Sequence, residues 1–386
     1  MPRPASILYL DHLASTPLDP EVLEAMLPWL SAGGVGNPHS AHGAGWRATD
    51  AVEVARAEVA ALVGARPGEV IFTSGATEAN NLALLGAVPE GWPVFVSAVE
   101  HPSVLEVLPE LARLSHRTER LPVDESGRVD PRHLAGRLAD GPALLSVMAA
   151  NNEVGTIQPV AELAALSRAH GALFHTDAAQ ALSTVALDMR GQGIDLLSLS
   201  GHKLYGPMGI GALVVCDGVN LRPRSFGGGQ QEGRRAGTLP VALCVGLGAA
   251  CRLAATRRAA DTARLFRMRE RLFAALSAAI PDLRRNSPPD GLASCLHVTL
   301  PGVDAADLLL DLPELAVSTG SACATGRHGP SHVLLAMGRS AEEAYGSLRF
   351  GLGHGTTEAE LDQAVRRIAM AAARRRSDEA GTIHTP

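Results

Sequence analysis

The chain of 386 residues contains one lysine, Lys203, in the stretch SGHKLYGP, although it carries 34 lysine and arginine side chains in all. Arginine keeps its proton at any accessible pH, whereas a partly desolvated lysine can lose its proton and act as a nucleophile or form a Schiff base. Lys203 is therefore a candidate for covalent chemistry. The alternative is a lysine that survived by chance in a loop, and the neighbouring motifs have to separate the two.

Two other motifs supply groups that such chemistry would use. In TSGATEANN (Thr73–Asn81), a glycine and small residues pass from a strand into a helix, which leaves the amides of Ala76 and Thr77 as a seat for an anion such as phosphate. Asp177, in HTDAAQ, ends an apolar run, and a buried carboxylate there needs a cationic or N–H partner. An amine, an acid and a phosphate seat at successive strand ends match pyridoxal 5'-phosphate as the cofactor.

The elements that would position these groups alternate between about residues 70 and 216. The short apolar runs are VIFTS, VFVSA, LLSVM, LFHTD, LLSLS and IGALVV, and helix-like stretches separate several of them. Such alternation predicts a largely parallel sheet with helices on both faces, in which ligands bind at the carboxyl ends of the strands. The polar motifs SGATEANN, EHPS, NNEVG, TDAAQ and SGHK each follow an apolar run directly, so we expect them to meet at one edge.

A long helical region from Pro240 to about Ile280 leads to a second, shorter alternation, which predicts a smaller α/β domain. We place the domain boundary in this helix. The expected division is a large cofactor-binding domain at 15–255 and a small domain that combines 1–14 with 256–386 and includes a loop at about 318–332.

Composition narrows the class of protein. A net charge of −6 and a pI near 6.2 argue against a nucleic-acid or anionic-membrane surface. No apolar stretch is long enough to span a bilayer, and the N-terminus lacks the pattern of a secretion signal, so we expect a cytoplasmic protein. Five cysteines without a C-x-x-C pair fit neither a disulfide framework nor a metal site. Of these, Cys216, Cys244 and Cys251 lie in apolar stretches and are expected to pack in the core.

Two further segments suggest how a substrate would be held and transformed. Arg349 lies in the apolar run SLRFGLG, where its planar fork either binds a substrate carboxylate, together with Asn152 of NNEVG, or forms an internal salt bridge to an aspartate or glutamate. Cys323, in STGSACATGRHGP, lies among small residues and glycines that core packing would not require. A thiol in such a loop is expected to be exposed and available as a nucleophile.

The motifs from LYLDHLASTPLDPEV to SLRFGLGHGTTEAEL resemble those of the cysteine desulfurases, in the class V aminotransferase group of pyridoxal-phosphate enzymes. The resemblance implies fold type I, with a large α/β domain whose mainly parallel seven-stranded sheet is sandwiched by helices, and a smaller C-terminal α/β domain. The spacing from Cys323 to His332 is like that of the long-loop group, which includes iron-sulfur and nitrogenase-associated enzymes.

The resemblance also implies roles for individual cofactor-binding residues. Lys203 would carry the cofactor covalently, Asp177 would bind the pyridine nitrogen, and Gln180 would hydrogen-bond the phenolic oxygen. His101 would stack on the ring and exchange protons with the substrate thiol. Outside the resemblance, a histidine and a glutamine at such positions are as readily explained as hydrogen-bonded loop and turn residues. The phosphate would be held by Ala76, Thr77, Ser200, His202 and, from the partner subunit, Thr238.

The implied reaction converts L-cysteine to L-alanine, with Asn152 and Arg349 holding the substrate carboxylate and Cys323 receiving the sulfur as a persulfide. A homodimer and a sulfur-acceptor protein are the implied partners. The acceptor would serve iron-sulfur cluster assembly, tRNA thiolation or DNA phosphorothioation. Two alternatives stay open: another class V enzyme, such as a selenocysteine lyase or an aminotransferase, and a non-catalytic sulfur-carrier scaffold.

The implied dimer yields the first testable prediction. Since the resemblance places Thr238 at the partner's phosphate, Thr238→Ala is expected to weaken retention of the cofactor without unfolding the protein. Dialysis followed by measurement of bound cofactor, alongside thermal unfolding, checks both halves. A fully active monomer in solution would contradict the expectation.

Overall fold

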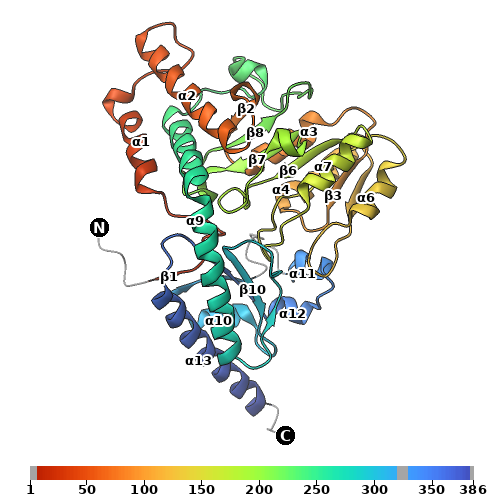
Figure 1. Ribbon diagram of the computed structural model, residues 1–386, viewed down its shortest axis with the longest axis vertical. Coiled ribbons are helices and arrows are strands. Elements are labelled where there is room, and N and C mark those ends of the chain that lie inside the picture. Colours follow the sequence, from red (N-terminus) through yellow and green to blue (C-terminus); the bar gives the residue numbers. More distant parts are fainter. Residues whose placement is uncertain (1–6, 320–328, 383–386) are drawn as a thin grey trace.

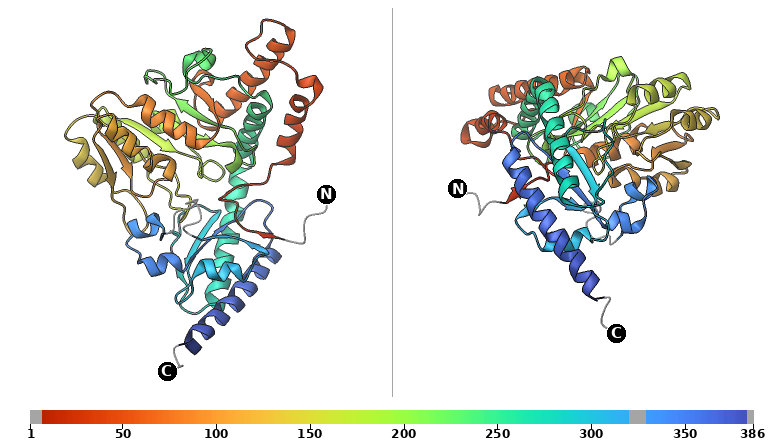
Figure 2. Two further views of the ribbon diagram at one scale, coloured as in Figure 1. Left: turned by 180° about the vertical axis from the view of Figure 1, so that it is seen from behind. Right: turned by 60° about the horizontal axis from the view of Figure 1, so that its bottom comes forward.

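The computed structural model describes residues 7–319 and 329–382, whose elements form two parts joined by the long helix α9 (Val241–Ala279). In Figure 1 the upper part holds the large sheet and its covering helices, and the lower part holds two small sheets and α13 (Glu358–Thr382). Helix α9 runs through both parts. Helix α13 packs along its lower half, as Figures 1 and 2 both show.

The large sheet has seven strands in the order β2-β8-β7-β6-β5-β3-β4. From β7 to β4 each neighbouring pair is parallel, whereas β8 is antiparallel to both β7 and β2. The predicted mainly parallel seven-stranded sheet is therefore confirmed. The strands are β2 (Val70–Thr73), β3 (Val94–Ser97), β4 (Thr118–Leu121), β5 (Leu144–Ser146), β6 (Leu173–Asp177), β7 (Leu196–Ser200) and β8 (Gly211–Val215).

The sheet is buried on both faces because its apolar runs put alternate side chains into two separate cores. Leu197 and Leu199 of β7 pack in the core shared with α2, α7 and α9, whereas Leu196 packs in the core shared with α3, α4 and α5. Phe72 and Ile71 divide in the same way on β2. The expectation of helices on both faces is met.

The helices of the upper part connect successive strands or cover their faces. They are α1 (Pro20–Leu30), α2 (Gly43–Leu62), α3 (Ala76–Ala87), α4 (Pro102–Leu105), α5 (Leu108–Arg113), α6 (Pro131–Leu138), α7 (Val160–Ala169) and α8 (Met189–Gln192). Short 3-10 turns lie at Ala32–Gly34, Pro67–Glu69, Gly201–Lys203 and Gln230–Gly233.

The lower part contains a four-stranded antiparallel sheet and a parallel two-stranded pair. The larger sheet has the order β12-β13-β10-β9, and the pair joins the N-terminal strand to β11. The strands are β1 (Leu8–Tyr9), β9 (Arg284–Arg285), β10 (Cys295–Thr299), β11 (Leu315–Ala316), β12 (Ser318–Thr319) and β13 (Ser347–Gly351). The remaining helices are α10 (Ala305–Leu310), α11 (His332–Ala336) and α12 (Ala341–Tyr345).

Helix α9 changes core along its length of 39 residues. Its side chains up to Leu253 pack in the core of the large sheet, and those from Leu265 onward pack in the core of the small sheets. The predicted boundary at 255/256 falls between these two positions, and the division into two domains stays a prediction. No helix in the described part of the chain is long and apolar enough to cross a membrane.

Arg269 ties α9 to the loop that precedes β10. Its side chain is fully buried, and its guanidinium donates to the backbone oxygens of Pro289, Gly291 and Leu292 at 2.6, 3.0 and 2.9 Å. This loop continues into the large part, because the amide of Leu292 donates to the backbone oxygen of Gly155 at 2.7 Å. One buried side chain therefore connects the long helix to both parts of the fold.

Replacement of this side chain should destabilise the protein. Arg269→Met keeps the helix and most of the side-chain volume but leaves three backbone acceptors without their donor, and we expect a loss of about 3 kcal/mol in the free energy of unfolding. Urea denaturation measures it. Arg271→Met is the matched control, because Arg271 is exposed and pairs with Asp362 at the surface. The control should lose less than about 1 kcal/mol, and equal losses would refute the assignment.

Candidate active site

A cavity of about 580 Å³ lies at the carboxyl ends of β5, β6 and β7, where the polar motifs meet as predicted. Cavities of this size commonly hold small ligands and cofactors. Its lining includes these predicted site residues: Ala76, Thr77, His101, Asn152, Asp177, Gln180, Ser200, His202 and Lys203.

The N-terminus of α3 forms one wall of the cavity. The helix follows Gly75, whose φ of +152° is a conformation that side-chain-bearing residues rarely adopt, and no side chain caps its first turn. A Cβ atom on Gly211 would lie 2.7 Å from the Cα of Gly75, so only glycine allows the two backbones to approach this closely. Ala76 and Thr77, whose amides have no partner within a helix at its first turn, line the cavity together with Ser200 and His202.

His202 contributes a neutral imidazole to that corner. Burial and the nearby charge of Lys203 lower the pKa of His202 to about 4. Its Nδ1 lies 3.4 Å from Oγ of Ser15, and its backbone oxygen accepts from the amide and hydroxyl of Thr16 at 3.0 and 2.9 Å. The residue is thus held in place by the N-terminal segment and can donate a hydrogen bond without adding a charge.

Asp177 ends β6 and is buried, yet its carboxylate has partners on both oxygens. Oδ2 accepts from Nδ2 of Asn80 at 2.7 Å, and Oδ1 accepts from the amide of Ala179 at 2.9 Å. Asn80 also donates to Oγ of Ser103 at 2.8 Å, and it is fully buried on α3. Sequence reasoning missed Asn80, although a polar residue on the apolar face of the TEANN helix was a signal that could have found it.

Lys203 lies at the cavity wall with its amine turned toward the N-terminal segment. Its Nζ donates to the backbone oxygens of Leu13 and Ala14, the latter at 2.9 Å. Nε2 of Gln180 donates to the same oxygen of Leu13 at 2.8 Å. Both predicted residues therefore line the cavity, and both are held by one short stretch of backbone that sequence reasoning did not assign to the site.

His101 caps helix α4 and also lines the cavity. Its Nδ1 accepts from the amide of Ser103 at 3.1 Å and lies 2.8 Å from the hydroxyl of the same residue. Burial lowers the pKa of His101, while the negative charge of Asp177 works in the opposite direction. At neutral pH the ring is therefore uncharged and able to accept a proton.

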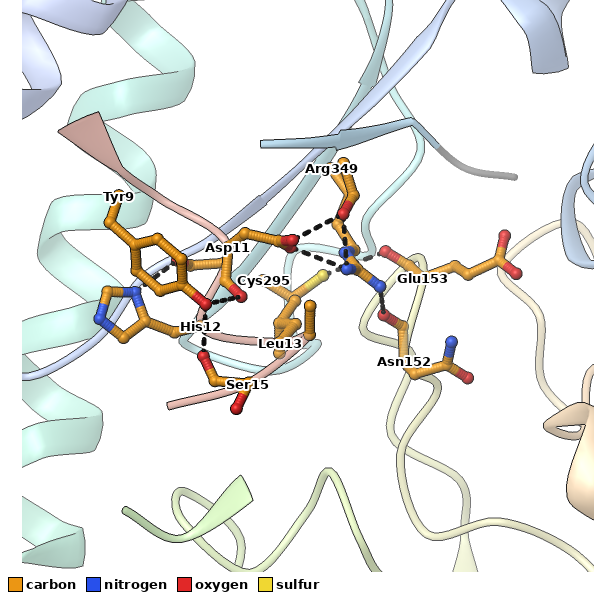
Figure 3. A network of polar contacts seen from close by, with 12 residues as sticks. Tyr9, Asp11, His12, Leu13, Ser15, Asn152, Glu153, Cys295 and Arg349 are labelled. Atoms are coloured by element: carbon orange, nitrogen blue, oxygen red, sulfur yellow. Dashed lines mark hydrogen bonds and ion pairs between the residues drawn. The ribbon is translucent and has the colours of Figure 1, made fainter. Parts of the chain in front are cut away.

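Arg349 is held apart from the cavity lining, behind Asn152. It is 1% exposed, and Nη1 donates to the backbone oxygen of Asn152 at 2.9 Å. Nη2 forms an ion pair with Oδ1 of Asp11 at 2.8 Å and donates to Oγ of Ser318 at 3.0 Å (Figure 3). The internal salt bridge that the sequence left open is thus present, and it sits next to the predicted carboxylate site.

The cavity lining leaves two further predicted residues to account for. Cys323 lies outside the described residues. Thr238 is exposed in the turn before α9 and does not line the cavity, so its role at a partner's phosphate stays a prediction.

The other cysteines behave as packing residues. Cys244, Cys251 and Cys295 are buried, and Cys216 is half-buried. Burial raises the pKa of Cys216 and Cys295 to about 11, that of Cys244 to about 12, and that of Cys251 as well. Among the described residues no thiol is thus suited to act as a thiolate at neutral pH.

The residues present fit pyridoxal phosphate by the chemistry of their side chains. The start of α3 with its glycine cradle suits a phosphate, Asp177 is a buried carboxylate near a cavity, and Lys203 supplies the amine. Asn80 reinforces the fit, because it orients Asp177 while its own buried Oδ1 accepts no hydrogen bond among the described residues.

Glu100, next to His101, is a buried acid with an unusual pKa. Oε1 accepts from Oγ of Ser97 at 2.5 Å and from the amide of Met148 at 2.7 Å, while burial raises the pKa of this carboxyl from 4.5 to about 8. Between these two values the folded protein holds a proton that the unfolded chain has released. The contribution of Glu100 to the free energy of unfolding therefore falls as pH rises through this window.

Glu100→Gln tests this linkage, because the amide keeps a neutral group with the same acceptor. Between pH 5 and pH 8 the free energy of unfolding of the variant should increase relative to that of the parent, as measured by urea denaturation at each pH. Glu125→Gln, at an exposed glutamate, is the control and should keep the parent's slope. An unchanged slope in Glu100→Gln would show that this carboxyl is ionised in the folded protein.

Comparison with known proteins identifies the family of the chain. The family model for aminotransferase class-V matches residues 8–364. A cysteine desulfurase of Rattus norvegicus is 42% identical over 93% of this chain and 81% of its own length. A structure of a NifS-like protein superimposes with a TM-score of 0.88 at 32% identity, and covers 95% of this chain and 99% of its own.

A structure of SspA in complex with cysteine superimposes with a TM-score of 0.79 at 35% identity, over 89% of this chain and 98% of its own. The fold, the cavity and these similarities lead to one assignment. The chain belongs to the aminotransferase class-V family of pyridoxal-phosphate enzymes, and its similarity over most of its length is to cysteine desulfurases.

Proposed function

We propose that the protein removes sulfur from L-cysteine, releases L-alanine and passes the sulfur to an acceptor protein. The observation that carries the proposal is a single cavity in which the chain's one lysine, a buried carboxylate and the N-terminus of α3 meet. Similarity to cysteine desulfurases supports the substrate, and the neighbouring structure of SspA is a complex with cysteine.

Bound pyridoxal phosphate supplies a carbonyl for the amine of L-cysteine and an electron-withdrawing ring that makes the α-proton acidic. The chain would hold this group with residues at the ends of four strands, β2, β3, β6 and β7. Asp177 would pair with the ring nitrogen, Gln180 with the phenolic oxygen, and His101 would stack on the ring. The phosphate would be held by Ala76, Thr77, Ser200, His202 and Thr238 of the second copy.

Lys203 and His101 would move the protons. The amine of Lys203, released from its contacts with the N-terminal segment, accepts the proton from the α-carbon of the substrate and returns it later. His101 is neutral at neutral pH because burial lowers its pKa, so it can take the proton from the substrate thiol. Arg349 and Asn152 would hold the substrate carboxylate during these transfers.

Cys323 would then receive the sulfur. Its thiolate attacks the sulfur of L-cysteine, the bond between that sulfur and the β-carbon breaks, and the electron pair of the broken bond stays with the carbon fragment. The fragment takes up protons and leaves as L-alanine, while the sulfur remains on Cys323 as a persulfide. An acceptor thiolate would remove it and restore the enzyme thiol.

The proposal also covers the oligomeric state, the sulfur acceptor and the cellular location. A homodimer would complete each phosphate site with Thr238, and the acceptor would belong to iron-sulfur cluster assembly, tRNA thiolation or DNA phosphorothioation. We place the protein in the cytoplasm, where reduced thiols persist. A selenocysteine lyase or an aminotransferase would need Lys203 but no enzyme thiol, so Cys323 separates these reactions from the proposed one.

Cys323→Ala is therefore the test. The variant should still bind cofactor and L-cysteine, but alanine release with sulfur transfer should fall by on the order of 10³ or more, because an essential nucleophile is missing. Alanine and persulfide are measured together, and the cofactor content is checked by absorbance.

Cys216→Ala serves as the matched control, because this thiol is half-buried and does not line the cavity. It should keep close to the parental rate. Desulfuration at a near-normal rate in Cys323→Ala would instead indicate an elimination that needs no enzyme thiol, and would favour the lyase reaction.

A further inference from the structure

The ion pair between Asp11 and Arg349 connects the N-terminal segment to the predicted carboxylate site (Figure 3). Nη2 of Arg349 lies 2.8 Å from Oδ1 of Asp11, and the guanidinium is almost fully buried. The hydroxyl of Ser318 bridges the pair: it donates to Oδ2 of Asp11 at 2.8 Å and accepts from Nη2 at 3.0 Å. The carboxylate therefore fixes the plane of the guanidinium fork on the side away from Asn152.

The backbone on either side of Asp11 packs closely against Gly351, which lies in β13 two residues after Arg349. The amide of His12 donates to the oxygen of Gly351 at 3.1 Å, and the amide of Gly351 donates to the oxygen of Leu10 at 2.7 Å. A Cβ atom on Gly351 would lie 2.6 Å from the amide nitrogen of Leu13, so no other residue allows this approach. The position of Asp11 relative to Arg349 is thus set by backbone contacts as well as by charge.

The same segment also reaches the cavity itself, because Ala14 is one of its lining residues. Three residues after Asp11, the oxygen of Ala14 accepts from Nζ of Lys203 at 2.9 Å, and the oxygen of Leu13 accepts from Gln180 at 2.8 Å. One stretch of four residues therefore contacts the group that would bind the substrate carboxylate and the groups that would bind the cofactor.

We propose that Asp11 is a positioning residue that holds the Arg349 guanidinium in the orientation required to recognise the α-carboxylate of an amino-acid substrate. The inference rests on the proposed function and deepens it. Without this carboxylate, the guanidinium of Arg349 would adopt more orientations. Binding would then have to order it, and this entropic cost would lower the affinity for every ligand that carries a carboxylate. Ligands without a carboxylate would be unaffected.

A different role for Asp11 would have the opposite effect on substrate binding. If Asp11 acted as a competing anion, it would weaken the attraction between Arg349 and the substrate, and its neutralisation would tighten binding. The contacts favour positioning, because Asp11 shares Nη2 with Ser318 while Nη1 is directed toward Asn152, which lines the cavity.

Asp11→Asn tests the proposal in the cofactor-loaded enzyme. L-alanine and ethylamine differ only by the carboxylate, so their dissociation constants, measured by calorimetry, report its recognition directly. In the variant the dissociation constant of L-alanine and the KM for L-cysteine should each rise about tenfold, with a smaller effect on kcat. The dissociation constant of ethylamine should change less than about twofold.

Two further variants keep the test decisive. Asp362→Asn, at an exposed ion pair with Arg271, is the matched control and should leave all constants unchanged. Ser318→Ala removes the bridging hydroxyl without changing charge and should raise the L-alanine constant about threefold, again without effect on ethylamine. It carries the test if Asp11→Asn does not fold.

Equal changes for L-alanine and ethylamine, no change for either, or tighter binding of L-alanine would each overturn the role of Asp11. Failure of the proposed function has a different signature, because the parent enzyme would then form no alanine from L-cysteine. The two failures are therefore distinguishable in one set of measurements.

Discussion

The parallel direction of five neighbouring strands is the constraint on which the site depends. Because β7, β6, β5, β3 and β4 all run the same way, their carboxyl ends lie along one edge of the sheet. Each parallel connection returns across a face of the sheet, so the helices that cover the sheet are a consequence of the same constraint. The cavity forms where these ends meet the N-terminus of α3 and the N-terminal segment.

Charge inside this protein is tolerated because each buried charged group has a specific partner. Asp177 accepts from Asn80 and from a backbone amide, and Arg349 is paired with Asp11. Where a carboxyl lacks a cationic partner, as at Glu100, burial raises its pKa to about 8 instead. The polar site therefore contains few unpaired charges. The same partners also hold the side chains of Asp177 and Arg349 in fixed orientations.

Much of the fold was predictable because its signals are local. Apolar runs bounded by glycine and polar residues marked the strands of the large sheet, and the TSGATEANN motif predicted a helix start beside Ala76 and Thr77, where α3 begins. Asn80 and Asp11 were not assigned to the site. Their roles depend on contacts with residues 97 and 338 positions away in the chain, which no local pattern reports. The backbone oxygens of Leu13 and Ala14 carry no signal of residue type at all.

By itself the sequence determined which groups are available: one lysine, a strand-ending aspartate, a glycine-led helix start and an arginine within an apolar run. The sequence also determined which strand each group follows, because the apolar pattern that marks a strand extends over only a few neighbouring residues. Only the tertiary structure decided that Arg349 pairs with Asp11 and that Lys203 and Gln180 contact the same N-terminal backbone. The reason is that hydrogen bonds and ion pairs are made in space, and their partners come from segments that pack together only when both cores have formed.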